Sequence, residues 1–401
     1  MSRDQLVAIA RKSMRHFQDG TVDLEPAQYR VATTIYTDPD RWKIEVDRIF
    51  KRLPLMLAFS CELQGTGAYR ALEVAGVPVL LTRSADGAIR AFVNMCSHRG
   101  AIVVEEGIGT ARRFSCPYHA WTYDTHGDLV GVLDAEAFGD LDRSCLGLTP
   151  LPVAERAGMI WVVLTPGSTL DIDSFLCGYG EMLEHLDLAS CHMVGRQSLV
   201  GPNWKLAYDG YIDFYHLPIL HRNTFGPDMS SKALYDAWGP HQRLTDPGRS
   251  LGVLAELPEE EWTTSKLVGG VWTIFPHVSI AAFDAGGRVW MVSQLFPGKA
   301  VGESITVQNF LHTQPPDDEQ AEIMVSRMAF NHHVVQDEDY YTGLRIQRAV
   351  ETGAKKEFIF GRNEGGAHRF HRWVQAIIEA DTDDELAQLF VAESEIGRAH
   401  V

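Results

Sequence analysis

Apolar residues recur with different spacings along the chain, and these spacings predict a strand-rich segment followed by a mixed one. Between residues 53 and 165, short apolar runs such as VPVLLTR and MIWVVLT are separated by Gly, Asp and Ser, the pattern of a compact antiparallel domain. The apolar stretch over residues 53–59 is typical of a buried strand, and residues 38–50 have the spacing of a helix.

After residue 166 the pattern predicts helices over residues 174–188 and 203–216. A strand-rich block over 271–311 then has the β-branched content of a curled antiparallel sheet, with a turn at 284–287. Helical spacing returns over 317–352 and 366–380. We therefore predict an α+β protein with one domain over residues 45–165 and a second built from 1–44 and 166–401.

Composition and charge exclude several classes of partner. The chain has 36 Lys and Arg against 53 Asp and Glu, a formal net charge of -17, and an anionic surface repels nucleic acid. No apolar run approaches the roughly 20 residues that span a bilayer, and the first residues lack the apolar core of a signal peptide. We expect a cytoplasmic enzyme that binds neither nucleic acid nor membrane.

Two pairs of metal-binding residues stand close together in the first domain. Cys96 and His98 form a CxH pair, Cys116 and His119 form a CxxH pair, and each pair follows a predicted strand. Two thiolates and two imidazoles can hold zinc, or a 2Fe-2S cluster with both cysteines on one iron. The spacing alone leaves both possibilities open.

A second candidate site lies in the segment NWKLAYDGYIDFYHLPILH. His216 and His221 are five positions apart, which would separate them by about 140° on a regular helix. Pro218 lies between them and lacks a backbone N–H, so we expect a break that brings the two rings together. Two buried, hydrogen-bonded histidines with no metal are the alternative.

The surrounding residues decide between these possibilities. CSHRG followed by CPYHAWTYDTHGDLVG closely resembles the Rieske motif of ring-hydroxylating oxygenase α subunits, and NWK followed by DxYHxxxxH is similar to the mononuclear iron motif of that family. The resemblance implies a Rieske domain and a START-like catalytic domain with a helix-covered curled sheet. It also implies that Cys96 and Cys116 ligate one iron of a 2Fe-2S cluster, and His98 and His119 the other.

The same family completes a facial triad of two histidines and one carboxylate, which leaves positions open on a ferrous iron. Three neighbouring acids compete for the third place: Asp337, Glu338 and Asp339. In the family the ligand often follows a Glu and precedes a Gln by eight positions, and Asp339 with Gln347 reproduces this spacing. We expect Asp339 to be the ligand, with Asp337 as the alternative.

The resemblance gives Asp213 a different role. The family's acid at this position connects its own subunit's iron ligand, here His216, with the partner subunit's His119, and electrons cross that bridge. A ring of subunits is then required, which predicts a trimer, α3 or α3β3 with a small β subunit. A simpler role for Asp213 is to orient His216. Asp209 departs from the family, which often has Asn there, and its role is open.

The resemblance implies a Rieske oxygenase that hydroxylates, by dihydroxylation, an aromatic or other apolar ring. The chain has no dinucleotide-binding fingerprint, so electrons from NAD(P)H must arrive through a separate reductase, with or without a ferredoxin. Three arginines near the cluster ligands are candidates for docking that carrier: Arg99, Arg112 and Arg113. Four apolar residues near the iron ligands are candidates for a substrate cavity: Leu206, Leu217, Leu220 and Phe225.

Three other functions compete with this interpretation. A monooxygenase or demethylase acting on a quaternary amine or a methoxyaromatic acid uses the same metal sites, but quaternary-amine relatives often carry Glu in place of Asp213. An electron carrier with a Rieske domain needs no second iron. A zinc-stabilised binding protein would not consume O2.

Overall fold

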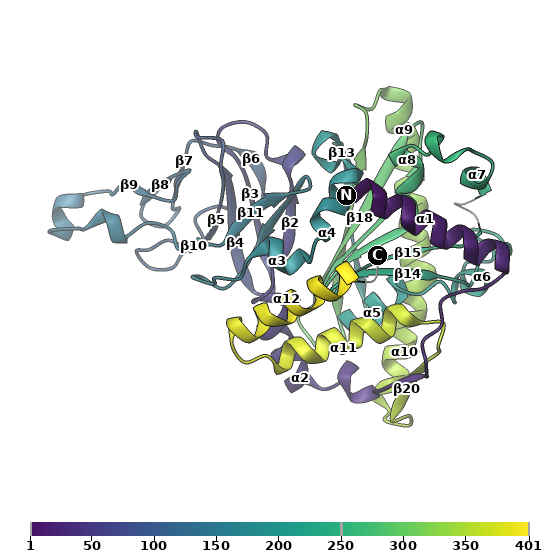
Figure 1. The fold of residues 1–401 in the computed structure, drawn as a ribbon. Helices are drawn as coiled ribbons and strands as arrows, with labels where there is room; N and C mark the ends of the chain where they lie inside the picture. Colours follow the sequence, from purple (N-terminus) through teal and green to yellow (C-terminus); the bar gives the residue numbers. More distant parts are fainter. Residues whose placement is uncertain (1, 249–251, 400–401) are drawn as a thin grey trace. The chain divides into compact units, whose positions relative to one another are not determined.

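The computed structural model describes residues 2–248 and 252–399, which form two compact units (Figure 1). The small unit is Phe50–Ile172, and the large unit joins the residues up to Ile49 to those from Asp173 onward. The boundaries therefore lie a few residues beyond positions 45 and 165, where the sequence pattern changes. Among the described helices, none has the length and apolar content needed to cross a bilayer.

The small unit is built from short antiparallel strands, as the sequence predicts. Its sheets have the orders β10-β5-β4-β3-β6, β11-β12-β2 and β7-β8-β9. The strands are β2 (Leu55–Phe59), β3 (Ala68–Val74), β4 (Val77–Arg83), β5 (Ile89–Val93), β6 (Gly107–Thr110), β7 (Arg113–Ser115), β8 (Thr122–Asp124), β9 (Leu129–Gly131), β10 (Pro150–Leu151), β11 (Val153–Arg156) and β12 (Met159–Val162). Every residue of β2 is buried, in agreement with its unbroken apolar sequence.

The large unit contains an extended antiparallel sheet with the order β13-β19-β18-β17-β16-β15-β14. The strands are β13 (His192–Gly201), β14 (Leu234–Trp238), β15 (His241–Thr245), β16 (Val271–Ile274), β17 (Val278–Asp284), β18 (Arg288–Pro297) and β19 (Ser304–His312). The predicted strand block becomes β16 to β19, and the turn expected at residues 284–287 joins β17 to β18. We did not predict β13, β14 or β15. A separate pair, β1 (Tyr29–Ala32) and β20 (Glu357–Phe360), completes the strands of this unit.

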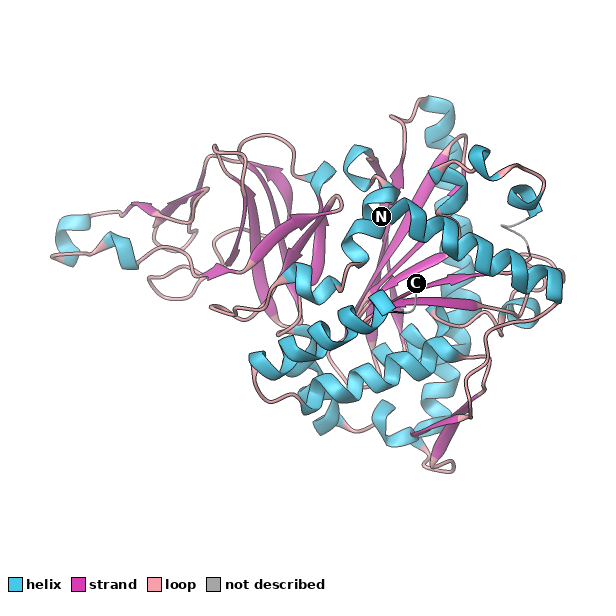
Figure 2. Ribbon diagram, in the orientation of Figure 1, coloured by secondary structure: helices cyan, strands magenta, loops and turns pink. Residues whose placement is uncertain are grey.

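Helices surround this sheet (Figure 2). The α-helices are α1 (Ser2–Asp19), α2 (Pro39–Glu45), α3 (Ile172–Leu176), α4 (Tyr179–Leu183), α5 (Trp204–Tyr211), α6 (Leu217–Leu220), α7 (Gly252–Ala255), α8 (Thr264–Leu267), α9 (Asp318–His333), α10 (Tyr341–Glu351), α11 (Gly365–Glu379) and α12 (Asp383–Ala399). Two π-helices, η2 (Val46–Phe50) and η9 (Val334–Tyr340), follow α2 and α9. Helix α5 packs on β18 and β19, and α9 packs on β13.

Two predicted helices are shorter than expected. The segment 174–188 is divided after α3 because Cys177 and Gly178 have left-handed backbones, with φ of 51° and 82°. A helix cannot continue through this conformation. Helix α5 starts at Trp204, where the Asn203 side chain caps it, and ends at Tyr211, before the residues of the second candidate site. The segment that holds His216 is therefore not part of α5.

A buried histidine makes the large unit sensitive to acid. His241 is fully buried; its Nε2–H donates to the Phe175 carbonyl at 2.8 Å, and its Nδ1 accepts the Phe275 N–H at 3.2 Å. Burial lowers the pKa of His241 to about 4. As pH falls below about 6.5, the unfolded chain therefore binds a proton at His241 that the folded chain does not yet bind. The contribution of neutral His241 to folding stability is complete above that pH and is lost as pH falls toward 4.

We expect His241 alone to lower the free energy of unfolding by about 3 kcal/mol at pH 4, because each unit of pKa shift corresponds to about 1.4 kcal/mol. Thermal unfolding between pH 7 and 4 should show a smaller decline in His241→Gln than in the natural protein. An unchanged pH dependence in that variant would show that His241 is not the group responsible.

Candidate metal centres

The two Cys/His pairs lie on loops with the same backbone conformation. One loop follows β5, and the other connects β7 to β8. In each, the cysteine N–H donates to the carbonyl five positions later at 2.8 Å, and the cysteine carbonyl accepts the N–H four positions later at 2.9 Å. That fourth residue is left-handed in both loops: Gly100, with φ of 77°, and Ala120, with φ of 57°. Cys96 and Cys116 thus lie at the start of two loops with matching backbone turns.

The thiols and imidazoles of these loops have different environments. Cys96 and Cys116 are buried, and the Cys96 Sγ lies 3.3 Å from the Tyr123 hydroxyl. His98 and His119 are half-buried, with ring centroids 4.7 Å apart. Burial, followed by the charges of neighbouring groups, lowers the pKa of His98 and favours a neutral, ligating imidazole. The cysteines thus form the inner side of the site and the histidines its outer side.

These four residues fit a cluster better than a single ion. Among the described residues, His, Cys, Asp and Glu form one group whose ligand atoms all lie within 4.8 Å of one another, and it does not include this set. A tetrahedral zinc needs four ligand atoms around one point, whereas a 2Fe-2S cluster separates the cysteine pair from the histidine pair. The His98 Nδ1 is buried without a hydrogen-bond partner, as expected of an atom that ligates a metal.

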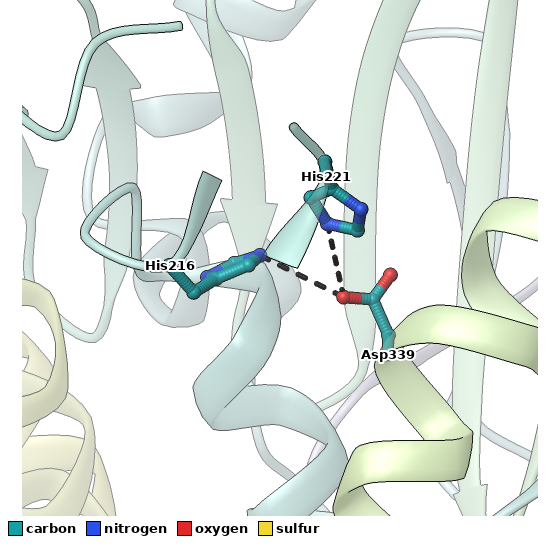
Figure 3. A group of neighbouring side chains, drawn as sticks. All are labelled: His216, His221 and Asp339. Atoms are coloured by element: carbon teal, nitrogen blue, oxygen red, sulfur yellow. Dashed lines mark ion pairs between the residues drawn. The ribbon is translucent and has the colours of Figure 1, made fainter. Parts of the chain in front are cut away.

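The group within 4.8 Å consists of His216, His221 and Asp339 (Figure 3). The Asp339 Oδ1 lies 3.1 Å from the His221 Nε2 and 3.6 Å from the His216 Nε2. His216 directly precedes the short helix α6, and His221 directly follows it. The two rings converge as expected, but without a break at Pro218: this residue lies in the first turn of α6, where its missing N–H has no intrahelical partner to lose.

Asp339 reaches this group from the π-helix η9. Single π-turns within α-helices are rare and occur frequently at functional sites. Asp337 lies outside the group and instead pairs with His333, at 2.7 Å on the exposed side. The geometry therefore favours Asp339 over its alternative. No sequence signal that we used predicts the π-turn.

A carboxylate accepts a hydrogen bond from the outer nitrogen of each histidine. The His216 Nδ1–H donates to Asp213 at 3.0 Å, and the His221 Nδ1–H donates to Glu338 at 2.6 Å. These bonds fix the ring orientations and leave both Nε2 atoms free to face Asp339. Burial would lower the pKa of His221, but its bonds with Asp339 and Glu338 raise it. Sequence reasoning considered Glu338 only as a ligand and missed this positioning role.

Comparison with known proteins identifies the family. Residues 54–141 match the Rieske [2Fe-2S] domain, and residues 185–380 match the catalytic domain of the ring-hydroxylating α subunit. The benzene 1,2-dioxygenase α subunit of Pseudomonas putida is 30% identical over 305 residues, covering 65% of this chain and 67% of that protein. The chain belongs to the Rieske ring-hydroxylating oxygenase α subunits.

Other members of the family are more distant. The large subunit of anthranilate 1,2-dioxygenase from Acinetobacter baylyi is 28% identical over 221 residues, which cover 52% of this α subunit but only 46% of that relative. The match thus spans about half of that relative's length. Naphthalene 1,2-dioxygenase from Rhodococcus has the same fold, with a TM-score of 0.74, 22% identity and coverage of 95% and 100% of the two chains. A quaternary ammonium Rieske monooxygenase has a TM-score of 0.75 at 20% identity, over 88% and 96%.

Asp209, the departure from the family pattern, has defined partners in this α subunit. One carboxylate oxygen accepts the Tyr36 hydroxyl at 2.8 Å, and the other lies 2.9 Å from the His371 Nε2. Tyr36 lies before the small unit in the sequence, and His371 belongs to α11. The carboxylate therefore ties three separate segments of the large unit together, one turn of helix before the loop of Asp213.

Of the four residues expected to line a substrate cavity, Leu217 and Leu220 are half-buried in α6. Leu206 packs in a cluster with Tyr36 and Val350, so it is a core residue. Phe225 lies beside the triad, with its ring centroid 5.4 Å from that of His221 and 5.8 Å from that of Phe330. These two rings form an apolar pair next to His221. Arg99, Arg112 and Arg113 are exposed near the cluster loops.

We predict that Glu338→Gln weakens binding of the mononuclear iron by about 10–100-fold, the usual effect of losing a carboxylate behind a ligating histidine. Titration of iron-depleted protein with ferrous ion measures this. Asp337→Asn is the matched control, because it removes a neighbouring charge that is 61% exposed and does not contact the triad. Equal affinities in the two variants would contradict a positioning role for Glu338.

Proposed function

We propose that this chain is the catalytic subunit of an oxygenase that dihydroxylates an aromatic or other apolar ring, using O2 and external electrons. The observation that carries the proposal is the presence in one chain of two paired Cys/His loops and a separate His/His/Asp group. An electron carrier does not need the His/His/Asp group. A zinc protein does not need two Cys/His loops arranged for a two-iron cluster.

The ligands follow from the donor sets. Cys96 and Cys116 would hold one iron of the cluster, and His98 and His119 the other. His216, His221 and Asp339 would hold the mononuclear iron. When bound, the cluster supplies single electrons and the mononuclear iron supplies O2 activation.

The protein residues prepare this site in three ways. Asp213 and Glu338 hold the outer N–H of each histidine, which fixes the neutral tautomer that ligates a metal. Asp339 places one carboxylate oxygen between the two Nε2 atoms. Phe225 and Phe330 place apolar rings beside His221 and would offer edge and face contacts to a ring substrate.

Electrons enter from outside the chain in this proposal. A reductase, with or without a ferredoxin, delivers them to the cluster, and the exposed Arg99, Arg112 and Arg113 offer positive charge to an acidic carrier. The partner subunit's His119, Asp213 and His216 would form the path from the cluster to the mononuclear iron, an arrangement that requires a ring such as a trimer.

A monooxygenase acting on a quaternary amine is the second candidate. It is favoured by the likeness of the fold to a quaternary ammonium monooxygenase, with a TM-score of 0.75. An aromatic pair such as Phe225 and Phe330 also suits a quaternary ammonium group. Asp213, where the amine-specific relatives often carry Glu, favours the ring substrate.

A single-turnover experiment tests the proposal without a reductase. The protein is reduced with dithionite and the reductant is then removed. The reduced protein is mixed with oxygen-18-labelled O2 and, in separate reactions, with benzene, naphthalene or carnitine. A ring diol with two labelled oxygens supports the dioxygenase, and labelled product from carnitine supports the second candidate. If no substrate is oxygenated although both metal sites are full, the proposed substrate classes are wrong.

A further inference from the structure

A small cavity in the large unit is distinct from both metal centres. It lies between α1, β15 and α8 and has a volume of about 20 Å³. A space of this size holds one water molecule or one monatomic ion. Its wall is mostly apolar, with polar groups from Ser13, Arg243 and Thr245 and one further charged residue, Lys266.

The Arg243 guanidinium is held rigidly against this cavity. Its Nε donates to the Gly269 carbonyl at 2.9 Å, and its Nη2 donates to the carbonyls of Leu267 and Gly269 at 2.5 and 2.6 Å. The ring of Trp272 lies under the guanidinium at 4.6 Å. The third nitrogen, Nη1, is buried without a hydrogen-bond partner.

Two hydroxyl groups share the cavity with this nitrogen. Thr245 lies two positions after Arg243 on β15, and thus on the same side of the strand, and its Oγ1 is also buried without a partner. Ser13 lines the cavity from α1 and is 2% exposed. Leaving a buried donor unsatisfied costs about 1–3 kcal/mol. Two such groups on residues that line one small space indicate that something occupies it.

The charge around the cavity distinguishes an anion from water. Both charged residues of its wall, Arg243 and Lys266, are cations. Asp236 is opposite Arg243 in the β14–β15 register and attracts it, but its carboxylate also lies 3.7 Å from Lys12, so this one negative charge faces two cations. In the described chain, no ion pair of 4.0 Å or less joins Arg243 to a carboxylate. Water would satisfy the donors, whereas an anion satisfies them and also neutralises the buried charge.

We infer that this cavity binds one monovalent, chloride-sized anion between Arg243, Thr245 and Ser13. The small volume favours a monatomic ion over phosphate or sulfate. A bound anion would stabilise the packing of α1 on the sheet, because it is held by the folded large unit alone. The inference does not depend on the oxygenase activity.

Crystals of the holoenzyme grown in sodium bromide test the site directly. An anomalous bromide peak within hydrogen-bond distance of the Arg243 Nη1 and Thr245 Oγ1 supports the inference. Density at that point without anomalous signal, as a water molecule would give, overturns it.

Thermal unfolding provides the second measurement. At constant ionic strength, replacing sodium gluconate by chloride or bromide should raise the unfolding temperature in a saturable manner. The increase should be lost in Thr245→Val and kept in Thr273→Val, a control that removes another buried hydroxyl, bonded instead to the Gln242 carbonyl. An equal halide effect in both variants, or none in the natural protein, contradicts the site. If Thr245→Val does not fold, the bromide crystal decides alone.

Discussion

Asp339→Asn is expected to lower product formation by at least about 100-fold. Loss of a residue that only hydrogen-bonds to a metal ligand lowers activity by at most about this factor, and Asp339 is a proposed ligand itself. Asp339 is the only anionic member of the group formed with His216 and His221 among the described residues. Its replacement leaves the shape of the side chain but removes the charge that balances a ferrous ion. The cluster should be unaffected, because its ligands lie in the other unit. Metal analysis should therefore show loss of the mononuclear iron with the cluster iron and sulfide retained.

Asp337→Asn is the matched control for this variant. Asp337 is two positions earlier in the same π-helix, yet it pairs with His333 and faces solvent. The Asp337→Asn variant should retain both the mononuclear iron and the activity. If Asp337→Asn lost the iron and Asp339→Asn kept it, the assignment of the triad would be reversed.

Asp213→Asn is expected to slow turnover by about 10–100-fold even when the iron site is full. The Asp213 carboxylate accepts the His216 Nδ1–H at 3.0 Å, and it is the proposed contact with the partner subunit's cluster ligand. An amide can keep one of these contacts but cannot accept from both nitrogens through two anionic oxygens. Stopped-flow oxidation of the reduced cluster by O2 and substrate measures the effect.

Added ferrous ion separates the two roles of Asp213. If Asp213 only orients His216, excess iron should restore the rate of cluster oxidation in Asp213→Asn. If Asp213 also bridges subunits, the rate stays low with the iron site saturated. Asp213→Glu keeps the charge and should recover part of the rate in the second case alone.

The sequence predicted most of the fold where the pattern is local. An unbroken apolar run predicted β2, the β-branched content of residues 271–311 predicted β16 to β19, and the helical spacing after residue 317 predicted α9, α10 and α11. The pattern failed where backbone conformation decides: left-handed Cys177 divides one helix. It also failed for β14 and for β15, which is buried on both faces although it contains polar residues such as Gln242 and Arg243. Such residues are stable there only through long-range hydrogen bonds that a local pattern does not contain.

The metal centres were predicted only in part, because a local sequence pattern shows the ligand pairs but not the distant residues that support them. Cysteine and histidine pairs close in sequence are visible in a motif, and the resemblance to a family supplied Asp339. The supports of these residues are not local. Glu338 reaches His221 across more than a hundred positions, and Tyr36 and His371 reach Asp209 across still more. These contacts exist only once the sheet and helices of the large unit have assembled.

We expect one chain to carry a Rieske cluster and a separate mononuclear iron. Iron, sulfide and zinc analysis of anaerobically purified protein, with the low-temperature EPR spectrum after dithionite reduction, tests this expectation most directly. We predict about three irons and two sulfides per chain, with a Rieske-type signal that is lost in His98→Ala. One or two zinc ions without sulfide would contradict it and indicate a structural metal protein.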